Sequence, residues 1–278
     1  MSAGDLTDGA RPPVTDAGFA RWVADQAGRA LCDLRSEVGF EDADLLRKLG
    51  DARAHELIAG VIDRWRPGDS LLSEEGVREN ADRATAARVW IVDPLDGTRE
   101  FGDRDRTDWA VHVALWRRDV DAEGTGAVAT RGTLVAGAVA LPALGQTLGT
   151  DNPPSFPSMR EAVGVPSMRL AVSRTRPPAV LDRLHGAWPD LELVPMGSVG
   201  RKVAAVISGE VDAYVHAGGQ YEWDSAAPVA VARATGLYAS RIDGSALEYN
   251  QPDPSLPDIV VCRKHVAPRL LGALAESA

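Results

Sequence analysis

The sequence predicts a protein of mixed structure, with an α+β first half and an α/β second half. Two long helical patterns near the N-terminus precede several apolar strands, which is the order of an α+β half. Beyond residue 157, short apolar strands alternate with helical segments, as in layered α/β proteins. With 278 residues, 45% of them hydrophobic, the chain is long enough to bury a full core.

A proline-rich segment separates the two halves. The run 151–157 contains three prolines, which favour an extended connection over a helix or a central strand. We therefore predict a metal-site half over residues 15–157 and a substrate half over residues 158–278. Residues 1–14 are expected to be a flexible tail.

Helical and strand patterns follow one another in the first half. Thr15 or Asp16 caps a first helix whose apolar residues recur on one face up to Leu34. A second helix is expected after Gly50-Asp51 and ends before Pro67-Gly68. Strands are predicted at 71–72, 89–92, 109–116, 133–141 and 146–149, with an exposed hairpin loop at 117–131 and a turn at 142–144.

The second half repeats a shorter strand and helix pattern. Its predicted strands lie at 170–172, 191–194, 211–215 and 259–262, and its predicted helices at 178–188, 199–208, 225–235 and 267–275.

The composition of the chain narrows the classes of molecule that it is expected to bind. The net charge of −10 argues against a nucleic-acid polymer, which requires a basic face. A small phosphorylated substrate is compatible with it, because bound divalent cations reverse the local charge. No apolar run is long enough for a membrane span, and no signal pattern is seen. Cys32 and Cys262 form no CxxC pair, so we expect a cytoplasmic, reduced protein without a membrane partner.

Residues 93–98 (Asp-Pro-Leu-Asp-Gly-Thr) carry the strongest chemical signal. They follow four apolar residues, and Pro94 and Gly97 restrict the backbone so that the two carboxylates are held in place on a turn. The carboxylate oxygens of the two aspartates, a nearby hydroxyl and free backbone N–H groups together suit a Mg²⁺ ion and a phosphate. The alternative for a shorter Asp-Gly pattern is an ordinary turn after a strand.

Two more acidic positions complete a candidate metal set. Glu74 follows a short strand and Asp224 opens a helix. The alternative for Glu74 is a solvated strand end, and Asp224 taken alone is better explained as a helix N-cap. With Asp93 and Asp96 they supply enough carboxylates for two or three Mg²⁺ ions, and the Leu95 carbonyl is a further ligand.

Other metal and phosphate chemistries fit less well. Carboxylates without Cys or paired His favour Mg²⁺ over zinc, and the five histidines lack HxxxH and HExxH spacing. A P-loop is also lacking. The spacing DxxDGT is one residue longer than the DxDGT of haloacid-dehalogenase phosphatases, which excludes that nucleophile arrangement.

Three ordered segments resemble the inositol monophosphatase superfamily of lithium-sensitive, Mg²⁺-dependent phosphatases. They are residues 73–76 (Ser-Glu-Glu-Gly), 90–98 and 223–227 (Trp-Asp-Ser-Ala-Ala). The resemblance covers residues 15 to 275 and implies a layered αβαβα sandwich. Members often form homodimers, an assembly that the sequence itself neither supports nor opposes.

Further segments resemble the CysQ-type 3′(2′),5′-bisphosphate nucleotidases within that superfamily. Residues 98–101 (Thr-Arg-Glu-Phe) are similar to the branch's TKEF, 197–202 to its GSSLK, and 222–227 to its EWDTAA. Residues 171–176 are similar to its VSRSH, but Arg176 replaces His. His216 stands where the branch commonly has Arg. Both departures lie in the nucleotide-binding half.

The resemblance implies roles for individual residues. Glu74, Asp93 and the Leu95 carbonyl would hold one Mg²⁺, and Asp93, Asp96 and Asp224 a second. Thr98 with Glu74 would activate water for in-line attack, and Asp51 would join this network or be an ordinary carboxylate near a helix N-terminus. Substrate contacts are implied for the following residues: Asp96, Gly97, Thr98, Ser173, Ser198, Lys202 and Asp224. The alternative for Lys202 is a solvated helix lysine.

The implied reaction is hydrolysis of the 3′-phosphate of adenosine 3′,5′-bisphosphate, or of its 5′-phosphosulfate, in sulfur assimilation. The two departures leave room for a different or broader substrate, such as inositol phosphate or fructose 1,6-bisphosphate. A non-catalytic metal- or nucleotide-binding protein on the same fold is a third alternative. It would be expected to have lost a ligand, whereas all of the motif carboxylates are present.

Overall fold

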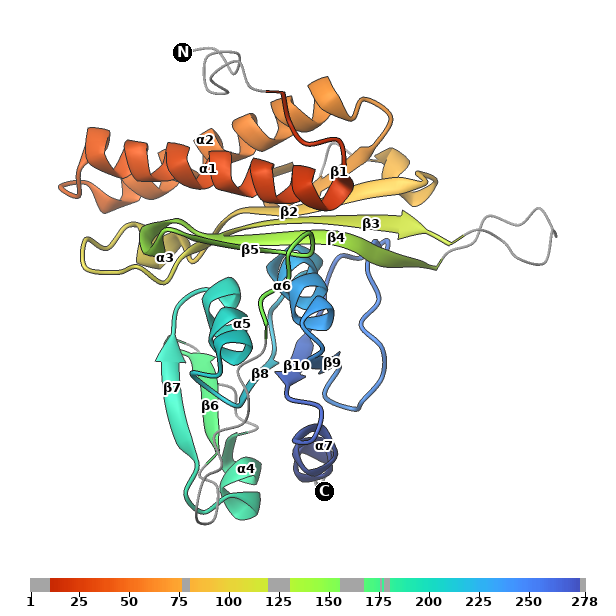
Figure 1. The fold of residues 1–278 in the computed structure, drawn as a ribbon. Helices are drawn as coiled ribbons and strands as arrows, with labels where there is room; N and C mark the ends of the chain where they lie inside the picture. Colours follow the sequence, from red (N-terminus) through yellow and green to blue (C-terminus); the bar gives the residue numbers. More distant parts are fainter. Residues whose placement is uncertain are drawn as a thin grey trace.

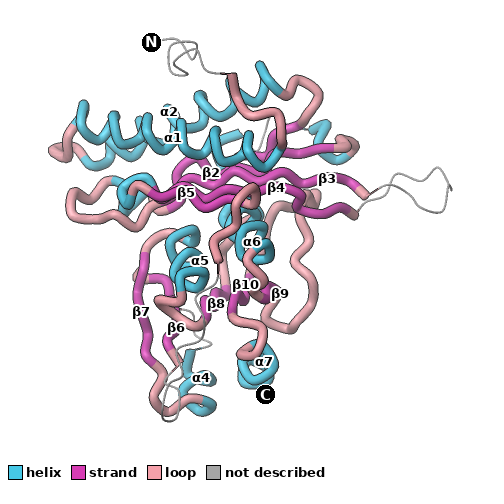
Figure 2. The backbone as a smooth tube through the Cα atoms, viewed as in Figure 1, coloured by secondary structure: helices cyan, strands magenta, loops and turns pink. Residues whose placement is uncertain are grey.

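The structure, a computed structural model, describes residues 11–76, 81–119, 131–155, 168–175, 177 and 181–275. Its elements stack in alternating layers, as Figure 1 shows: a helix pair, a sheet, a second helix pair, a second sheet and a last helix pair. Figure 2 shows the same order, with the strands of the two sheets separated by helices. This is the predicted αβαβα sandwich. The predicted hairpin loop lies largely outside the described residues, and so does the predicted boundary between residues 157 and 158.

The outer helix pair consists of α1 (Asp16–Val38) and α2 (Ala43–Trp65). Thr15 caps α1 as predicted, since its hydroxyl accepts a bond from the Gly18 N–H at 3.2 Å. The prediction that α2 starts after Gly50-Asp51 was wrong, because Asp42 caps a helix that begins two turns earlier. Gly50 lies inside α2, where a Cβ would come 2.6 Å from Phe101 and 2.9 Å from Leu95.

That close approach fixes the position of Asp51. A glycine inside a helix costs stability, but here it lets α2 pass directly over the segment that carries the 93–98 motif. Asp51 is therefore a mid-helix residue that points toward this motif, and the interpretation as a carboxylate at a helix N-terminus does not apply.

The first sheet has the strand order β1-β2-β3-β4-β5, with β1 and β2 parallel and the other pairs antiparallel. Its strands are β1 (Ser70–Ser73), β2 (Arg88–Asp96), β3 (Ala110–Arg118), β4 (Gly132–Leu141) and β5 (Gln146–Gly149). Short 3₁₀ turns occupy Glu74–Gly76, Ala81–Ala84 and Pro142–Leu144. Helices cover both faces of β2 and β3, so nearly every residue of these strands is buried.

The two motif aspartates lie on β2 rather than on a turn after it. Asp93 pairs with His112 and Asp96 with Ala110, and the register shifts between these pairs. The resulting bulge accommodates Pro94, which cannot donate a ladder bond. The turn begins at Gly97, whose φ of 85° favours glycine.

The second sheet has the order β7-β6-β8-β10-β9. Its strands are β6 (Arg169–Ser173), β7 (Glu192–Met196), β8 (Ala213–Ala217), β9 (Tyr238–Ser240) and β10 (Asp258–Cys262). The short strand β9 was not predicted. The remaining helices are α3 (Thr98–Phe101), α4 (Leu181–Ala187), α5 (Val199–Ser208), α6 (Glu222–Ala234) and α7 (Ala267–Ala275).

Helices α5 and α6 lie between the two sheets (Figure 1), and α6 starts earlier than predicted. Asp224 is consequently the third residue of α6, and Tyr221 occupies the N-cap position that we had expected for Asp224. The apolar residues of both helices join the core between the sheets, while separate cores lie under α1 and α2 and under α4 and α7. Among the described residues, no helix combines the length and apolar composition needed to cross a bilayer.

Candidate metal and phosphate site

The motif at the end of β2 brings two carboxylates to the centre of the molecule. Asp93 is 1% exposed and Asp96 is 7% exposed. The Leu95 N–H donates to Asp93 Oδ1 at 3.0 Å, and the Gly200 N–H at the start of α5 donates to Asp96 Oδ2 at 2.9 Å. Each bond occupies one oxygen of its carboxylate, so the remaining oxygen is oriented by the backbone.

Three further acidic residues face the same centre from other elements. Asp224 comes from α6, where its Oδ2 accepts the Tyr221 N–H at 2.7 Å, and Asp51 comes from α2. Glu74 comes from the turn after β1 and is the most solvent-accessible of the group. The site therefore opens toward Glu74 and closes toward Asp93. We call Glu74, Asp93, Asp96 and Asp224 the carboxylate cluster.

Burial and like charge disfavour ionisation of the carboxylate cluster. Burial first, then the neighbouring carboxylates, raise the pKa of Asp93 well above its usual range. Burial raises the pKa of Asp96 and of Asp224 to about 6, and Asp96 adds to the effect on Asp224. Partial burial and the charges of Asp224, Glu75 and Asp51 raise the pKa of Glu74 to about 7, although this side chain remains accessible to solvent. A bound cation would relieve this repulsion.

Thr98 connects this centre to α2. Its hydroxyl lies 3.1 Å from the Leu95 carbonyl and 3.5 Å from Asp51 Oδ1, and both of these oxygens can accept its single proton. Burial, followed by the charge of Glu75, raises the pKa of Asp51 to about 6. A hydroxyl that donates its proton to a carboxylate can accept a hydrogen bond from a second group on its own oxygen.

His112 is a member of this site that sequence reasoning missed. Potential ligand atoms of Asp93, Asp96 and His112 all lie within 4.8 Å of one another. His112 Nε2 is 3.2 Å from Asp96 Oδ2 without hydrogen-bond geometry, and Nδ1 is 3.3 Å from the Trp223 carbonyl. Burial lowers the pKa of His112 to about 4, so the ring is neutral at pH 7. The signal in the sequence that could have identified His112 is that it is a single polar residue within the apolar run of β3.

The start of α5 forms the opposite wall. Ser198 is 1% exposed and caps α5, since its hydroxyl accepts the Arg201 N–H at 3.0 Å. Lys202 is also buried, and its Nζ donates to the Gly197 carbonyl at 2.6 Å. Burial lowers the pKa of Lys202, while the charges of Asp96 and Glu100 oppose that shift. Lys202 is therefore a buried cation facing the carboxylates and not a solvated helix lysine.

Glycines let these walls approach one another. At Gly97 a Cβ would lie 3.2 Å from the Ser198 Cβ and 3.3 Å from the Trp109 Cα. At Gly200 a Cβ would lie 2.4 Å from His112 Nε2. The N-terminus of α5 can therefore reach Asp96 only because residue 200 is glycine.

The remaining predicted positions lie around this centre. Ser173 is half-buried at the end of β6, next to Arg174, whose guanidinium pairs with Glu100 at 2.6 Å. Arg176 lies outside the described residues. His216 is buried in β8, and its Nε2–H donates to the Gly218 carbonyl at 2.6 Å. This departure from the branch pattern thus stabilises the turn that leads into α6.

The donor set fits hard divalent cations. It consists of carboxylate oxygens together with the Leu95 carbonyl, whose second lone pair remains beside its bond from Thr98. His112 adds one nitrogen next to Asp96. The buried group of Asp93, Asp96 and His112 is therefore a candidate metal-binding site, and Glu74 and Asp224 are further candidate ligands beside it.

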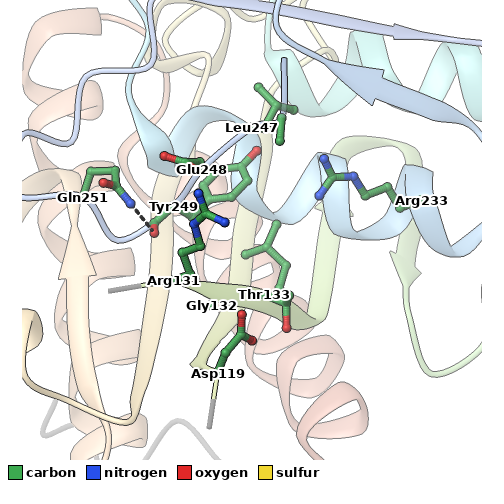
Figure 3. A pocket seen from close by; sticks show the side chains of 11 residues that line it. Asp119, Arg131, Gly132, Thr133, Arg233, Leu247, Glu248, Tyr249 and Gln251 are labelled. Carbon is green, nitrogen blue, oxygen red and sulfur yellow. Dashed lines mark hydrogen bonds between the residues drawn. The ribbon is translucent and has the colours of Figure 1, made fainter. Parts of the chain in front are cut away.

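A separate hollow lies at the other end of β3 and β4 (Figure 3). It combines basic, acidic and aromatic side chains and includes none of the predicted site residues: Asp119, Arg131, Gly132, Thr133, Leu134, Arg233, Ala246, Leu247, Glu248, Tyr249 and Gln251. Its two arginines are balanced by Asp119 and Glu248, so its charge indicates no particular ligand.

Comparisons with known proteins agree with this geometry. Residues 31–278 match the inositol monophosphatase family, and the chain belongs to this family. The 3′-phosphoadenosine 5′-phosphate phosphatase of Mycobacterium leprae (strain TN) is 48% identical over 265 residues, which cover 95% of this chain and 94% of the relative.

Two solved structures share the fold. Inositol monophosphatase II from Staphylococcus aureus MSSA476 superposes with a TM-score of 0.72 at 19% identity, covering 93% of this chain and 95% of the other. CysQ from Bacteroides thetaiotaomicron, a bacterial member of the inositol monophosphatase family, gives a TM-score of 0.68 at 26% identity, covering 88% and 96%. The predicted family and layered fold are confirmed.

Proposed function

We propose that this chain is a Mg²⁺-dependent phosphatase that hydrolyses the 3′-phosphate of 3′-phosphoadenosine 5′-phosphate and releases AMP. The observation that carries the proposal is the carboxylate cluster, because its members are held ionised at neutral pH most readily by a bound cation. The substrate is supported by the name of the Mycobacterium leprae relative, which matches this chain over nearly its full length.

The proposed metal ligands divide into two sets. Glu74, Asp93 and the Leu95 carbonyl would hold one Mg²⁺. Asp93, Asp96 and Asp224 would hold the second, and a third ion is compatible with the number of oxygens. When bound, Mg²⁺ supplies positive charge that neutralises the phosphate and makes a nearby water more acidic.

Thr98, Asp51 and Glu74 would handle the proton of the attacking water. The Thr98 hydroxyl can pass its proton to Asp51 while it accepts one from water, since it lies 3.5 Å from Asp51 Oδ1. With a pKa of about 6, Asp51 is mostly ionised at pH 7 and can take up that proton. Glu74, at the open side of the cluster, would orient the same water.

The start of α3 and the start of α5 would bind the substrate. The N–H groups of Gly97 and Thr98 precede the first helical bonds of α3 and are proposed to hold the scissile phosphate. Lys202 would contribute a buried positive charge to the second phosphate. Ser198 and Ser173 are proposed to line the same region, although Ser198 already caps α5.

The test compares phosphate release from three substrates by the full chain. We expect 3′-phosphoadenosine 5′-phosphate to give a higher kcat/KM than inositol 1-phosphate or fructose 1,6-bisphosphate, with Mg²⁺ required and Li⁺ inhibitory. EDTA provides the metal-free control. Equal rates for all three substrates, or a preference for inositol 1-phosphate, would refute the substrate assignment. No Mg²⁺-dependent release from any of them would refute the enzyme itself.

A further inference from the structure

Tyr221 is an exposed aromatic residue at the edge of an otherwise buried site. It occupies the N-cap position of α6, three residues before Asp224. It is 45% exposed, although large apolar rings are usually covered in a folded protein. One face of its ring lies against Trp223, with the centroids 4.7 Å apart and the planes inclined by only 12°.

The position of this ring is tied to the carboxylate cluster by two contacts. The Tyr221 N–H donates to Asp224 Oδ2 at 2.7 Å, so the backbone of Tyr221 is hydrogen-bonded directly to a proposed metal ligand. Its stacking partner Trp223 is only 5% exposed, packs in the core between the sheets, and has its carbonyl 3.3 Å from His112 Nδ1. The ring therefore does not require ordering by a ligand.

There is room beside the turn that precedes Tyr221. Gly218 and Gly219 both have positive φ angles, of 94° and 74°. No atom would lie within 4 Å of a Cβ added at Gly218. Because Trp223 covers one face of the Tyr221 ring, the exposed part of the side chain includes the other face and the ring edge.

We propose that the free face of Tyr221 stacks on the nucleobase of the substrate and thereby selects a nucleotide over a sugar phosphate. The inference rests on the proposed function, since it concerns the same site. A purine has a flat apolar face that stacks on an aromatic ring, whereas inositol and fructose have none. The Trp223–Tyr221 pair would gain the base as a third stacked ring, and the proposed metal ligand Asp224 is hydrogen-bonded to the backbone of Tyr221.

Equilibrium binding of AMP and ribose 5-phosphate, measured by calorimetry with Mg²⁺, isolates the contribution of the base. These ligands share sugar and phosphate and differ in adenine. We expect Tyr221→Ala to weaken AMP binding about tenfold or more and to leave ribose 5-phosphate unchanged. Tyr221→Phe, which keeps the ring, should bind AMP like the wild type. Leu144→Ala, an exposed apolar residue on another turn, is the control.

Turnover gives a second readout that separates the inference from the proposed function. In Tyr221→Ala, KM should rise for 3′-phosphoadenosine 5′-phosphate with kcat nearly unchanged, and neither parameter should change for inositol 1-phosphate. Equal weakening of AMP and ribose 5-phosphate, or a Tyr221→Phe variant as weak as Tyr221→Ala, would overturn the stacking role. If the wild type binds AMP through Tyr221 but does not hydrolyse the bisphosphate, only the proposed function fails. Thermal unfolding of each variant confirms that it is folded.

Discussion

In the part of the chain that the structure describes, acidic side chains have arginine ion-pair partners in the rim of the site and lack them in the neighbouring carboxylate cluster. In the rim, which we define as Glu100, Arg106, Asp108 and Arg174, each carboxylate has a guanidinium partner: Arg174 for Glu100 and Arg106 for Asp108. Within the described residues, no arginine or lysine forms an ion pair with any member of the carboxylate cluster. Burial raises the pKa values of all four members.

The negative charges of the rim are neutralised by arginines of the protein itself. Those of the carboxylate cluster are left to be neutralised by protons or by a bound cation. An ion-paired carboxylate can stabilise the fold without any bound ion. A cluster of like charges destabilises the fold when it is ionised, and either protons or a bound cation relieve the repulsion. Variants in the two regions should therefore differ in sign as well as in size.

Asp93→Asn should have the largest effect on activity. It removes a ligand shared by both proposed ions, so we expect Mg²⁺-dependent phosphate release to fall by about a thousandfold or more. The same change removes like charge from a fully buried position, so the metal-free protein should unfold at a higher temperature than the wild type. Phosphate release and thermal unfolding in EDTA measure the two effects.

Asp108→Asn is the matched control from the rim. It leaves Arg106 without its partner and weakens the bond from the Gly197 N–H, which is 2.6 Å from Asp108 Oδ2. We expect a loss of about 1–3 kcal/mol in the free energy of unfolding, with or without Mg²⁺. If Asp93→Asn destabilised the metal-free protein and Asp108→Asn did not, the distinction between the two regions would be wrong.

His112→Ala should weaken Mg²⁺ binding by about ten- to a hundredfold, as expected for a residue that orients a ligand. The ring lies between Asp96 Oδ2 and the Trp223 carbonyl and so connects the segments that carry two members of the cluster. Calorimetric titration of Mg²⁺ measures this effect without turnover. His112→Asn can restore one of the two contacts and should recover part of the affinity. Unchanged Mg²⁺ affinity in His112→Ala would show that the ring only fills space.

Two adjacent basic residues of α5 differ in burial, and we expect substitutions of them to have smaller effects than those above. Lys202 is buried and faces Asp96, whereas Arg201 pairs with the more accessible Glu210 at 2.7 Å. We expect Lys202→Met to raise KM for 3′-phosphoadenosine 5′-phosphate about tenfold, and more than for inositol 1-phosphate. Arg201→Gln should change neither value. Equal effects of Lys202→Met on both substrates would assign Lys202 to the cluster rather than to the second phosphate.

The sequence predicted much of this arrangement because its motifs are local. The composition of residues 93–98 indicates their chemistry without any distant contact, and the patterns of α1, α5 and β4 are regular enough to be assigned directly. The bulge that places Asp93 and Asp96 on β2 was not predicted, because it depends on pairing with β3. The start of α2 was placed wrongly because Gly50 was interpreted as a helix boundary. This glycine instead lies inside α2, where it leaves room for Phe101 and Leu95 from a distant segment. His112 was missed for a similar reason, since its role depends on strand pairing with Asp93 and on the start of α5.

The pH dependence of stability should be the smallest effect and the most direct test of the comparison. Asp51, Asp96 and Asp224 have pKa values of about 6 and Glu74 of about 7, against about 4 for such groups in an unfolded chain. Between about pH 4 and pH 7, these four groups therefore bind more protons in the folded metal-free protein than in the unfolded chain. Their contribution to stability falls as the pH rises through this window. His112, whose pKa burial lowers to about 4, contributes in the opposite direction below about pH 6.5, but it is one group against four.

Mg²⁺ binds the ionised carboxylates and should reverse this trend. We expect the difference in Tm between samples with Mg²⁺ and with EDTA to grow from pH 5 to pH 7.5, by about 5 °C or more, since protons compete with the metal at the lower pH. Asp108→Asn should show the same increase in the Tm difference with pH, at a lower overall Tm, because the rim residues form their ion pairs without the metal. A difference in Tm that stayed constant with pH would mean that the cluster does not take up protons in place of Mg²⁺, and the two regions would then be equivalent.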